Sequence, residues 1–166
     1  MATTSSFDIT STIDFQEVDN ALNQARKEVV QRYDFKGAKA DIELSEAEKT
    51  LTLTTADEMK MNALWEIVQT RLVRRSVAVK NFKVGTSEPS AGGNLRRVIT
   101  IQQGIPTDAA KEIVKFLKDK KLKKVQASIQ SDQVRVSSPS KDELQEAMRI
   151  LREQDFGVAL QFGNYR

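Results

Sequence analysis

LTLTTADEMKMNALWEIV, from Leu51 to Val68, aligns without a gap on VRVSSPSKDELQEAMRIL, from Val134 to Leu151. Few residues are identical, but the apolar positions coincide across an offset of half of the 166-residue chain. A repeat of this length corresponds to a whole small domain rather than to one unit of a solenoid. The chain is therefore predicted to contain two similar modules, with its function on the surface of one module or between the two.

Both halves of the chain show the same order of predicted elements. Alternating apolar and polar residues predict strands at 6–10, 39–44, 50–55, 77–82, 95–103, 125–130, 133–137 and 158–162. Between them, apolar residues at helical spacing predict helices capped by Asp14, Thr55, Thr107 and Ser140. The resulting β-α-β-β-α-β order is that of a ferredoxin-like domain. The predicted fold class is therefore α+β, with two tandem ferredoxin-like domains whose four-stranded antiparallel sheets carry helices on one face only.

A Gly-, Ser- and Pro-rich segment at 85–94 separates the two halves. Such a composition is typical of loops and linkers. The predicted domains are therefore 1–84 and 95–166, joined by a linker at 85–94.

The composition limits the chemistry that this chain can perform. Hydrophobic residues make up 39% of the chain and charged residues 30%, as in a globular protein. No apolar run reaches the roughly 18 residues of a membrane span, and the first residues lack the pattern of a secretory signal. Cys and His are both absent, which excludes thiol nucleophiles, imidazole bases and the usual zinc ligands. We expect a cytoplasmic protein with no membrane contact, and its net charge of +3 permits an anionic partner.

Two short segments combine cations with aromatic or amide side chains, which are the residue types that bind a nucleobase and its phosphate. They are RYDFKG at 32–37 and QFGNYR at 161–166. The predicted nucleotide-binding residues are Arg32, Tyr33, Phe35, Lys36, Arg135, Gln161, Asn164 and Arg166. The competing interpretation places the aromatic residues of both segments in the core or against the terminus.

A run of lysines follows one face of a predicted helix and continues into the next turn. The alternative, nucleic-acid-binding residues are Lys111, Lys115, Lys118, Lys121, Lys123 and Lys124. Such a patch can bind a phosphate backbone with an affinity that falls as salt rises. A solvated helix face explains the same pattern, so both interpretations remain open.

Other nucleotide-binding and catalytic designs fit the sequence poorly. The strands TLTLTT and QVRVS contain no aromatic residue, so the base-stacking platform of RNA-recognition modules is absent. The glycines match neither the dinucleotide nor the P-loop fingerprint. Asp41 and Glu43 could hold a hard metal in a phosphodiesterase, but paired carboxylates on a strand are more often a solvated edge.

The combination of these stretches resembles the YajQ family of bacterial proteins. SFDITSTIDFQEVDNALNQARKEVVQRYDFKG is similar to the opening of that family, and KLKKVQASIQSDQVRVSSPSKDELQEAMRILREQDFGVALQFGNYR to its ending. The resemblance implies tandem ferredoxin-like domains that exchange their leading strands, at 6–10 and 95–103. It also implies nucleotide binding, with cyclic di-GMP as the ligand of some members, which work through protein or DNA partners. RNA and GTP binding are further activities that the resemblance implies.

Together, the residues and the resemblance lead to one main hypothesis and one alternative. The main hypothesis is a non-catalytic receptor for a guanine nucleotide, cyclic di-GMP in particular, that needs no cofactor and no metal. Its downstream partner would be a protein such as a transcription regulator. The alternative is an RNA- or tRNA-binding protein that uses the lysine-rich helix face.

Overall fold

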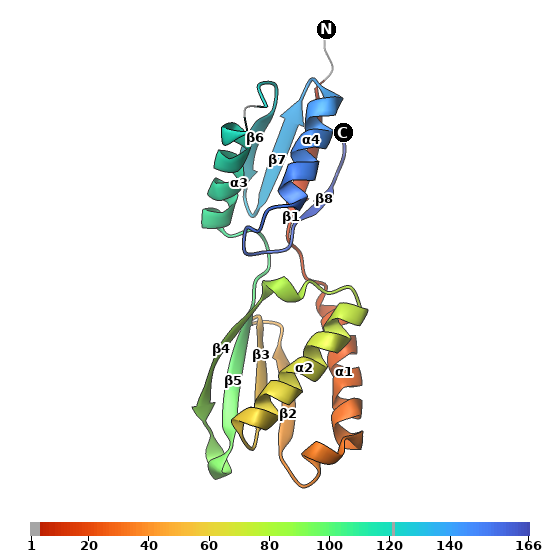
Figure 1. Cartoon of the computed structure of the whole chain (residues 1–166), viewed down its shortest axis with the longest axis vertical. Coiled ribbons are helices and arrows are strands. Elements are labelled where there is room, and N and C mark those ends of the chain that lie inside the picture. The colour runs from red at the N-terminus through yellow and green to blue at the C-terminus, as the bar shows by residue number, and fades with distance from the viewer. Residues whose placement is uncertain (1–3, 121) are drawn as a thin grey trace. The chain divides into compact units, whose positions relative to one another are not determined.

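The computed structural model describes residues 4–120 and 122–166 and divides into two compact units (Figure 1). One unit is the continuous segment Ile13–Gln102, here called the inserted unit. The other joins the chain up to Thr12 with Gln103–Arg166 and is called the split unit. The chain therefore passes between the units twice, after Thr12 and after Gln102.

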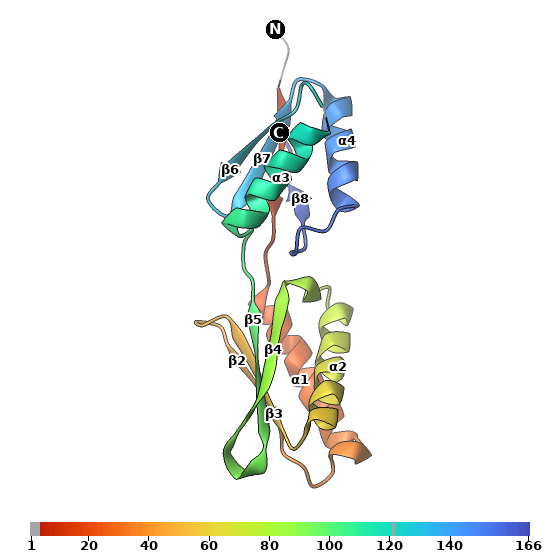
Figure 2. The ribbon, with the colours of Figure 1, turned by 60° about the vertical axis from the view of Figure 1, so that its left-hand side comes forward.

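The inserted unit is an antiparallel sheet covered by two helices on one face (Figure 2). Its strands, in the spatial order β2-β3-β5-β4, are β2 (Ala40–Ser45), β3 (Thr50–Thr55), β5 (Leu95–Ile101) and β4 (Phe82–Pro89). The helices are α1 (Phe15–Gln31) and α2 (Glu58–Arg74), with short 3-10 turns η1 (Tyr33–Phe35), η2 (Val79–Asn81) and η3 (Ala91–Gly93).

The split unit repeats this architecture with strands from both ends of the chain. Its sheet has the order β6-β7-β1-β8, from β6 (Gln126–Gln130), β7 (Gln133–Ser138), β1 (Ser5–Thr10) and β8 (Gln161–Gly163). Helices α3 (Thr107–Asp119) and α4 (Lys141–Arg152) pack on one face of this sheet.

The leading strands of the two halves are exchanged, as the family resemblance implies. β1 pairs with β7, where Phe7 lies opposite Val136, and with β8 on its other side. Its counterpart in the repeat, β5, pairs with β3, where Ile99 lies opposite Leu51. Both predictions, the α+β fold class and the exchange of strands, are confirmed.

The apolar periodicity of the sequence explains both cores. In α1, the stripe that begins at Val18 and Leu22 is buried, and Asp14 caps the helix by accepting from the backbone N of Gln16 at 3.0 Å. In β1, Phe7 and Ile9 are fully buried in the core of the split unit. Burying an aliphatic or aromatic side chain of this size stabilises the fold by about 1.5–3 kcal/mol, so β1 contributes substantially to the split unit.

The segment predicted as a linker, 85–94, contains the end of strand β4 in the structure. β4 continues to Pro89 and forms a hairpin with β5, with a register shift between Val84 and Ser87. Gly92 and Gly93 have positive φ in the connecting turn. Turns and bulges use the same residue types as linkers, so composition could not tell them apart.

Two element boundaries also differ from prediction. The strand predicted at 77–82 begins only at Phe82, because residues Val79–Asn81 form the turn η2. The cap of α2 is Asp57, which accepts from the N of Lys60 at 2.8 Å, while Thr55 lies buried in β3.

No helix in the described part of the chain is long and apolar enough to cross a membrane.

Candidate functional site

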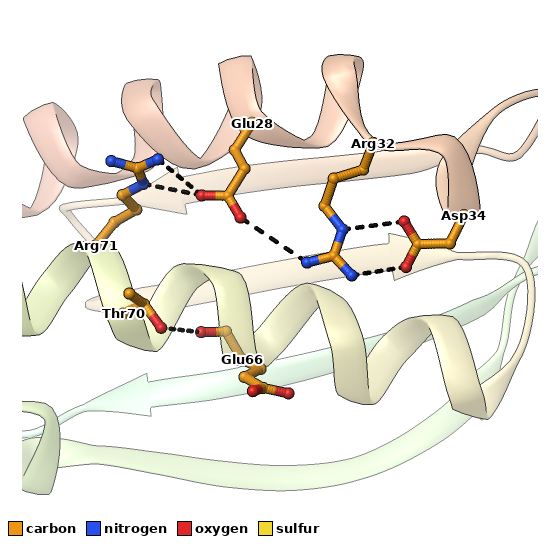
Figure 3. Close-up of polar contacts among 6 residues, drawn as sticks. All are labelled: Glu28, Arg32, Asp34, Glu66, Thr70 and Arg71. Atoms are coloured by element: carbon orange, nitrogen blue, oxygen red, sulfur yellow. Dashed lines mark hydrogen bonds and ion pairs between the residues drawn. The ribbon is translucent and has the colours of Figure 1, made fainter.

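The RYDFKG segment lies at the end of α1 in the inserted unit, and its charges are largely paired (Figure 3). Arg32 forms a two-pronged contact with Asp34, with Nε–Oδ1 at 2.9 Å and Nη2–Oδ2 at 2.8 Å. Its remaining Nη1 lies 3.8 Å from Oε2 of Glu28. The hydrogen bonds to Asp34 raise the pKa of Arg32, and those from Arg32 lower the pKa of Asp34. Arg32 therefore has little free capacity for a phosphate.

The two aromatic residues of this segment have different environments. Phe35 is only 4% exposed and belongs to the core, with the Arg32 guanidinium 5.8 Å from its ring centre. Tyr33 is 87% exposed, and Lys36 is exposed as well. The competing interpretation thus holds for Phe35, while Tyr33 and Lys36 remain accessible.

Arg135 lies on the helix-free face of the split unit, where it pairs with a buried carboxylate. Its Nε donates to Oδ1 of Asp8 at 2.9 Å, and Nδ2 of Asn164 donates to Oδ2 of the same residue at 2.6 Å. Asp8 is only 5% exposed. The hydrogen bonds from Arg135 and Asn164 lower the pKa of Asp8, and the Asp8 contact raises that of Arg135. Arg135 and Asn164 therefore neutralise and hydrogen-bond Asp8, which uses Nε of Arg135 and one N–H of the Asn164 amide.

Gln161 closes the same face by binding the chain after β1. Its Oε1 accepts from Oγ1 of Thr12 at 2.6 Å, and its Nε2 donates to the carbonyl of Thr12 at 3.0 Å. This side chain thereby fixes β8 against the end of β1. Its amide is used structurally rather than offered to a ligand.

The chain after β8 forms a bulge that turns Tyr165 toward the helices. Gly163 lies opposite Asp8, and Arg166 exchanges two backbone hydrogen bonds with Ser6, at 3.0 and 3.1 Å. Two residues on the tail therefore oppose one residue of β1, and Asn164 takes up the extra length with φ of 55°. As a result Oη of Tyr165 contacts Sδ of Met148 on α4 at 3.6 Å.

A cavity of about 560 Å³ lies where this tail meets α4 and β1, and it is called the tail cavity here. It is lined by Ser5, Ser6, Phe7, Lys141, Leu144, Gln145, Met148, Tyr165 and Arg166. The lining combines the apolar side chains of Phe7, Leu144 and Met148 with two cations and the ring of Tyr165. Tyr165 is 61% exposed, and no ion pair within the described residues involves the side chains of Lys141 or Arg166. The volume lies in the range of small-molecule sites, about 300–1,000 Å³.

The structure thus separates the predicted nucleotide-binding residues into two groups. Residues 32–36 belong to the inserted unit, whereas Arg135, Gln161, Asn164 and Arg166 belong to the split unit. Among these four, Arg166 lines the tail cavity. Sequence reasoning missed Lys141 as a candidate, although its position directly after the Ser140 cap placed a cation at the start of α4.

The lysine-rich helix face lies on α3, whereas the tail cavity is lined by α4, β1 and the tail. Lys111, Lys115 and Lys118 are exposed on one face, and Lys123 and Lys124 are exposed after the helix. Among the residues that the structure describes, these lysines form no ion pair. Lys121 lies outside the described residues.

Asp41, the first residue of the alternative metal site, pairs with Lys39 at 3.4 Å. In the described part of the chain, no group of three or more acidic residues is placed to hold a metal ion.

Comparison with known proteins gives matches over nearly the whole chain. A family model described as nucleotide-binding protein YajQ-like matches residues 5–166. A protein from Koribacter versatilis, named a nucleotide-binding protein, is 50% identical over 97% of this chain and 96% of its own. Proteins of the same name from Chloroherpeton thalassium and Carboxydothermus hydrogenoformans are each 45% identical over 100% of both chains.

Proposed function

Because this chain belongs to the YajQ family of nucleotide-binding proteins, we propose that it is a non-catalytic receptor for a guanine nucleotide. The tail cavity is its binding site, and cyclic di-GMP is the ligand. The main support for this proposal is that the exposed ring of Tyr165 and the unpaired cations Lys141 and Arg166 line one largely apolar cavity in the split unit.

Each part of the tail cavity suits one part of a nucleotide. The ring of Tyr165 offers a face on which a base can stack, with Phe7 and Met148 below it. Base stacking on an aromatic side chain contributes about 1–3 kcal/mol per base. Lys141 pairs with a phosphate as a point charge, and the Arg166 fork suits either a phosphate or the O6 and N7 acceptors of guanine.

The polar lining supports binding without hydrolysis. Ser5, Ser6 and Gln145 supply hydroxyl and amide groups at the rim. No side chain in the described lining is a carboxylate. A carboxylate side chain would repel a phosphate, and it is one of the few bases left in a chain without His or Cys. Among the lining side chains, a bound phosphodiester therefore contacts cations and hydrogen-bond donors, and the response to it passes to a protein partner.

Calorimetric titration of the full chain with cyclic di-GMP, GTP, GMP and cyclic di-AMP tests this function. Tyr165→Ala is expected to weaken guanine-nucleotide binding roughly 5- to 150-fold, the equivalent of the stacking contribution. Tyr165→Phe retains the ring and should bind nearly as the native chain does. Lys141→Ala and Arg166→Ala should each weaken binding as well.

Tyr33→Ala and Lys36→Ala are the matched controls, because they remove an exposed ring and an exposed cation from the inserted unit. They are expected to leave affinity unchanged. If no guanine nucleotide binds, the proposed function fails. If binding is lost in the two controls and kept in Tyr165→Ala, the ligand site is the RYDFKG segment and the tail cavity is the wrong assignment.

A further inference from the structure

The outer strand of the split unit, β6, has an edge that nothing in its sequence protects. It lies at the end of the sheet order and pairs with β7 in unbroken register from Gln126 to Gln130. In an antiparallel strand, alternate residues direct their N–H and C=O groups away from the partner, so β6 presents unpaired backbone groups outward. Natural edge strands are usually blunted by charges, proline or bulges, and QASIQ has none of them.

The edges of the inserted unit differ from β6 in this respect. β2 carries two carboxylates, Asp41 and Glu43, and β4 carries a register shift and ends at Pro89. Both devices disfavour the addition of a further strand. The bare edge of β6 is therefore a local property of the split unit rather than a general feature of this chain.

Two shallow hollows, of about 260 and 290 Å³, lie between α3 and this edge. Their apolar lining includes Val114 of α3 with Ala127 and Ile129 of β6, and Ile129 is 41% exposed. In a strand added beside β6, every second side chain would point toward α3. The hollows are placed to receive the apolar members of such an alternation.

The charges around these hollows are of one predominant sign. Lys111, Lys115 and Lys118 line them and form no ion pair with any described residue, and Asp119 is the one carboxylate in the described lining. These three lysines, with Val114, Ala127 and Ile129, are called the lysine groove. A segment that fills it must bring carboxylates to offset the lysines and backbone groups to pair with β6.

We propose that the lysine groove binds an extended, acidic segment of a partner protein, in which apolar and acidic residues alternate, as a fifth strand beside β6. This mode combines main-chain hydrogen bonds for affinity with side-chain pockets for specificity. An RNA strand would use the lysines but would leave the apolar hollows and the strand edge without a function. The protein segment accounts for all three features.

The first test uses the full chain and a fluorescent short peptide of alternating Glu and Val. The Glu–Val peptide is expected to bind the chain, and a Lys–Val peptide of the same length is expected not to bind. The same Glu–Val peptide with N-methyl groups on alternate residues, which cannot donate to a strand edge, should lose binding. Equal binding of the methylated and unmethylated peptides would show a purely electrostatic contact and would overturn strand addition.

The second test locates the site. The triple variant Lys111→Glu, Lys115→Glu, Lys118→Glu should weaken peptide binding by about tenfold or more. The matched control, Lys27→Glu, Lys36→Glu, Lys49→Glu, makes the same change in net charge with exposed lysines of the inserted unit, and should bind normally. Amide chemical-shift changes on β6 in the native chain provide a readout that does not depend on any variant folding.

Two other outcomes would assign the surface differently and overturn the proposal. Binding of a short single-stranded RNA that is lost in the triple variant, with no peptide binding in the native chain, would make the groove a nucleic-acid interface. Self-association of the native chain in sedimentation, abolished in the triple variant, would make the occupant a second copy. Neither outcome bears on the nucleotide titration of the tail cavity.

Discussion

Replacing Ile9 by alanine tests whether β1 belongs to the unit that the structure assigns it to. Ile9 is fully buried in the core that contains Val134 and Ile113, far away in sequence. Truncating a buried isoleucine to alanine costs about 2–5 kcal/mol, because apolar contacts are lost and a cavity remains. The residue that follows β1 by only a few positions, Ile13, belongs to the other core.

Hydrogen exchange of the full chain, measured by mass spectrometry peptide by peptide, provides the assay. Ile9→Ala should accelerate exchange in residues 103–166 roughly 30-fold or more, since about 1.4 kcal/mol corresponds to a factor of ten. Exchange in residues 13–102 should change far less. Ile99→Ala, a fully buried residue of β5, is the matched control and should reverse this pattern. Faster exchange confined to residues 13–102 in Ile9→Ala would refute the assignment of β1.

Two further substitutions probe the split unit. Asp8→Asn should remove a contribution to stability that exists because hydrogen bonds from Arg135 and Asn164 lower the pKa of Asp8. This contribution is present above the ordinary carboxyl pKa of 3.8 and is lost as pH falls through the lower folded value. The urea midpoints of the native and variant chains should therefore converge in acid, and a gap that widens there would contradict the pairing. Gly104→Ala should destabilise the chain by about 1–3 kcal/mol in urea unfolding. The reason is that Gly104 has φ of +86° and an added Cβ would lie 2.8 Å from Cβ of Asp132. Gly163→Ala, where nothing lies within 4 Å of an added Cβ, is the control, and equal destabilisation at both positions would argue against this explanation.

Local periodicity was sufficient to predict most helices and strands, but not the way in which they assemble. The buried stripe of α1 at Val18 and Leu22 follows directly from helical spacing. The exchange of β1 and β5 between the units does not follow from periodicity, because both strands alternate apolar and polar residues and could complete either sheet. The exchange was expected only from the family resemblance. The composition of 85–94 could not distinguish a bulged hairpin from a flexible linker, because the two share their residue types.

The candidate site was less accessible to sequence reasoning for a physical reason. The pairing of Arg32 with Asp34 is local, and opposite charges two residues apart could have indicated it, but Arg32 was predicted to bind a nucleotide. Lys141 and Tyr165 line the same cavity because of the bulge at Asn164 and the position of α4 against β1. Neither feature leaves a periodic pattern in the sequence, so only the fold brings these side chains together.

The most direct test of the proposed function is a titration of the isotope-labelled full chain with cyclic di-GMP, followed by heteronuclear NMR. Saturable shift changes centred on Phe7, Lys141, Tyr165 and Arg166, around the tail cavity, are expected. Shift changes confined to residues 32–37, or none with any guanine nucleotide at saturating concentration, would contradict this assignment.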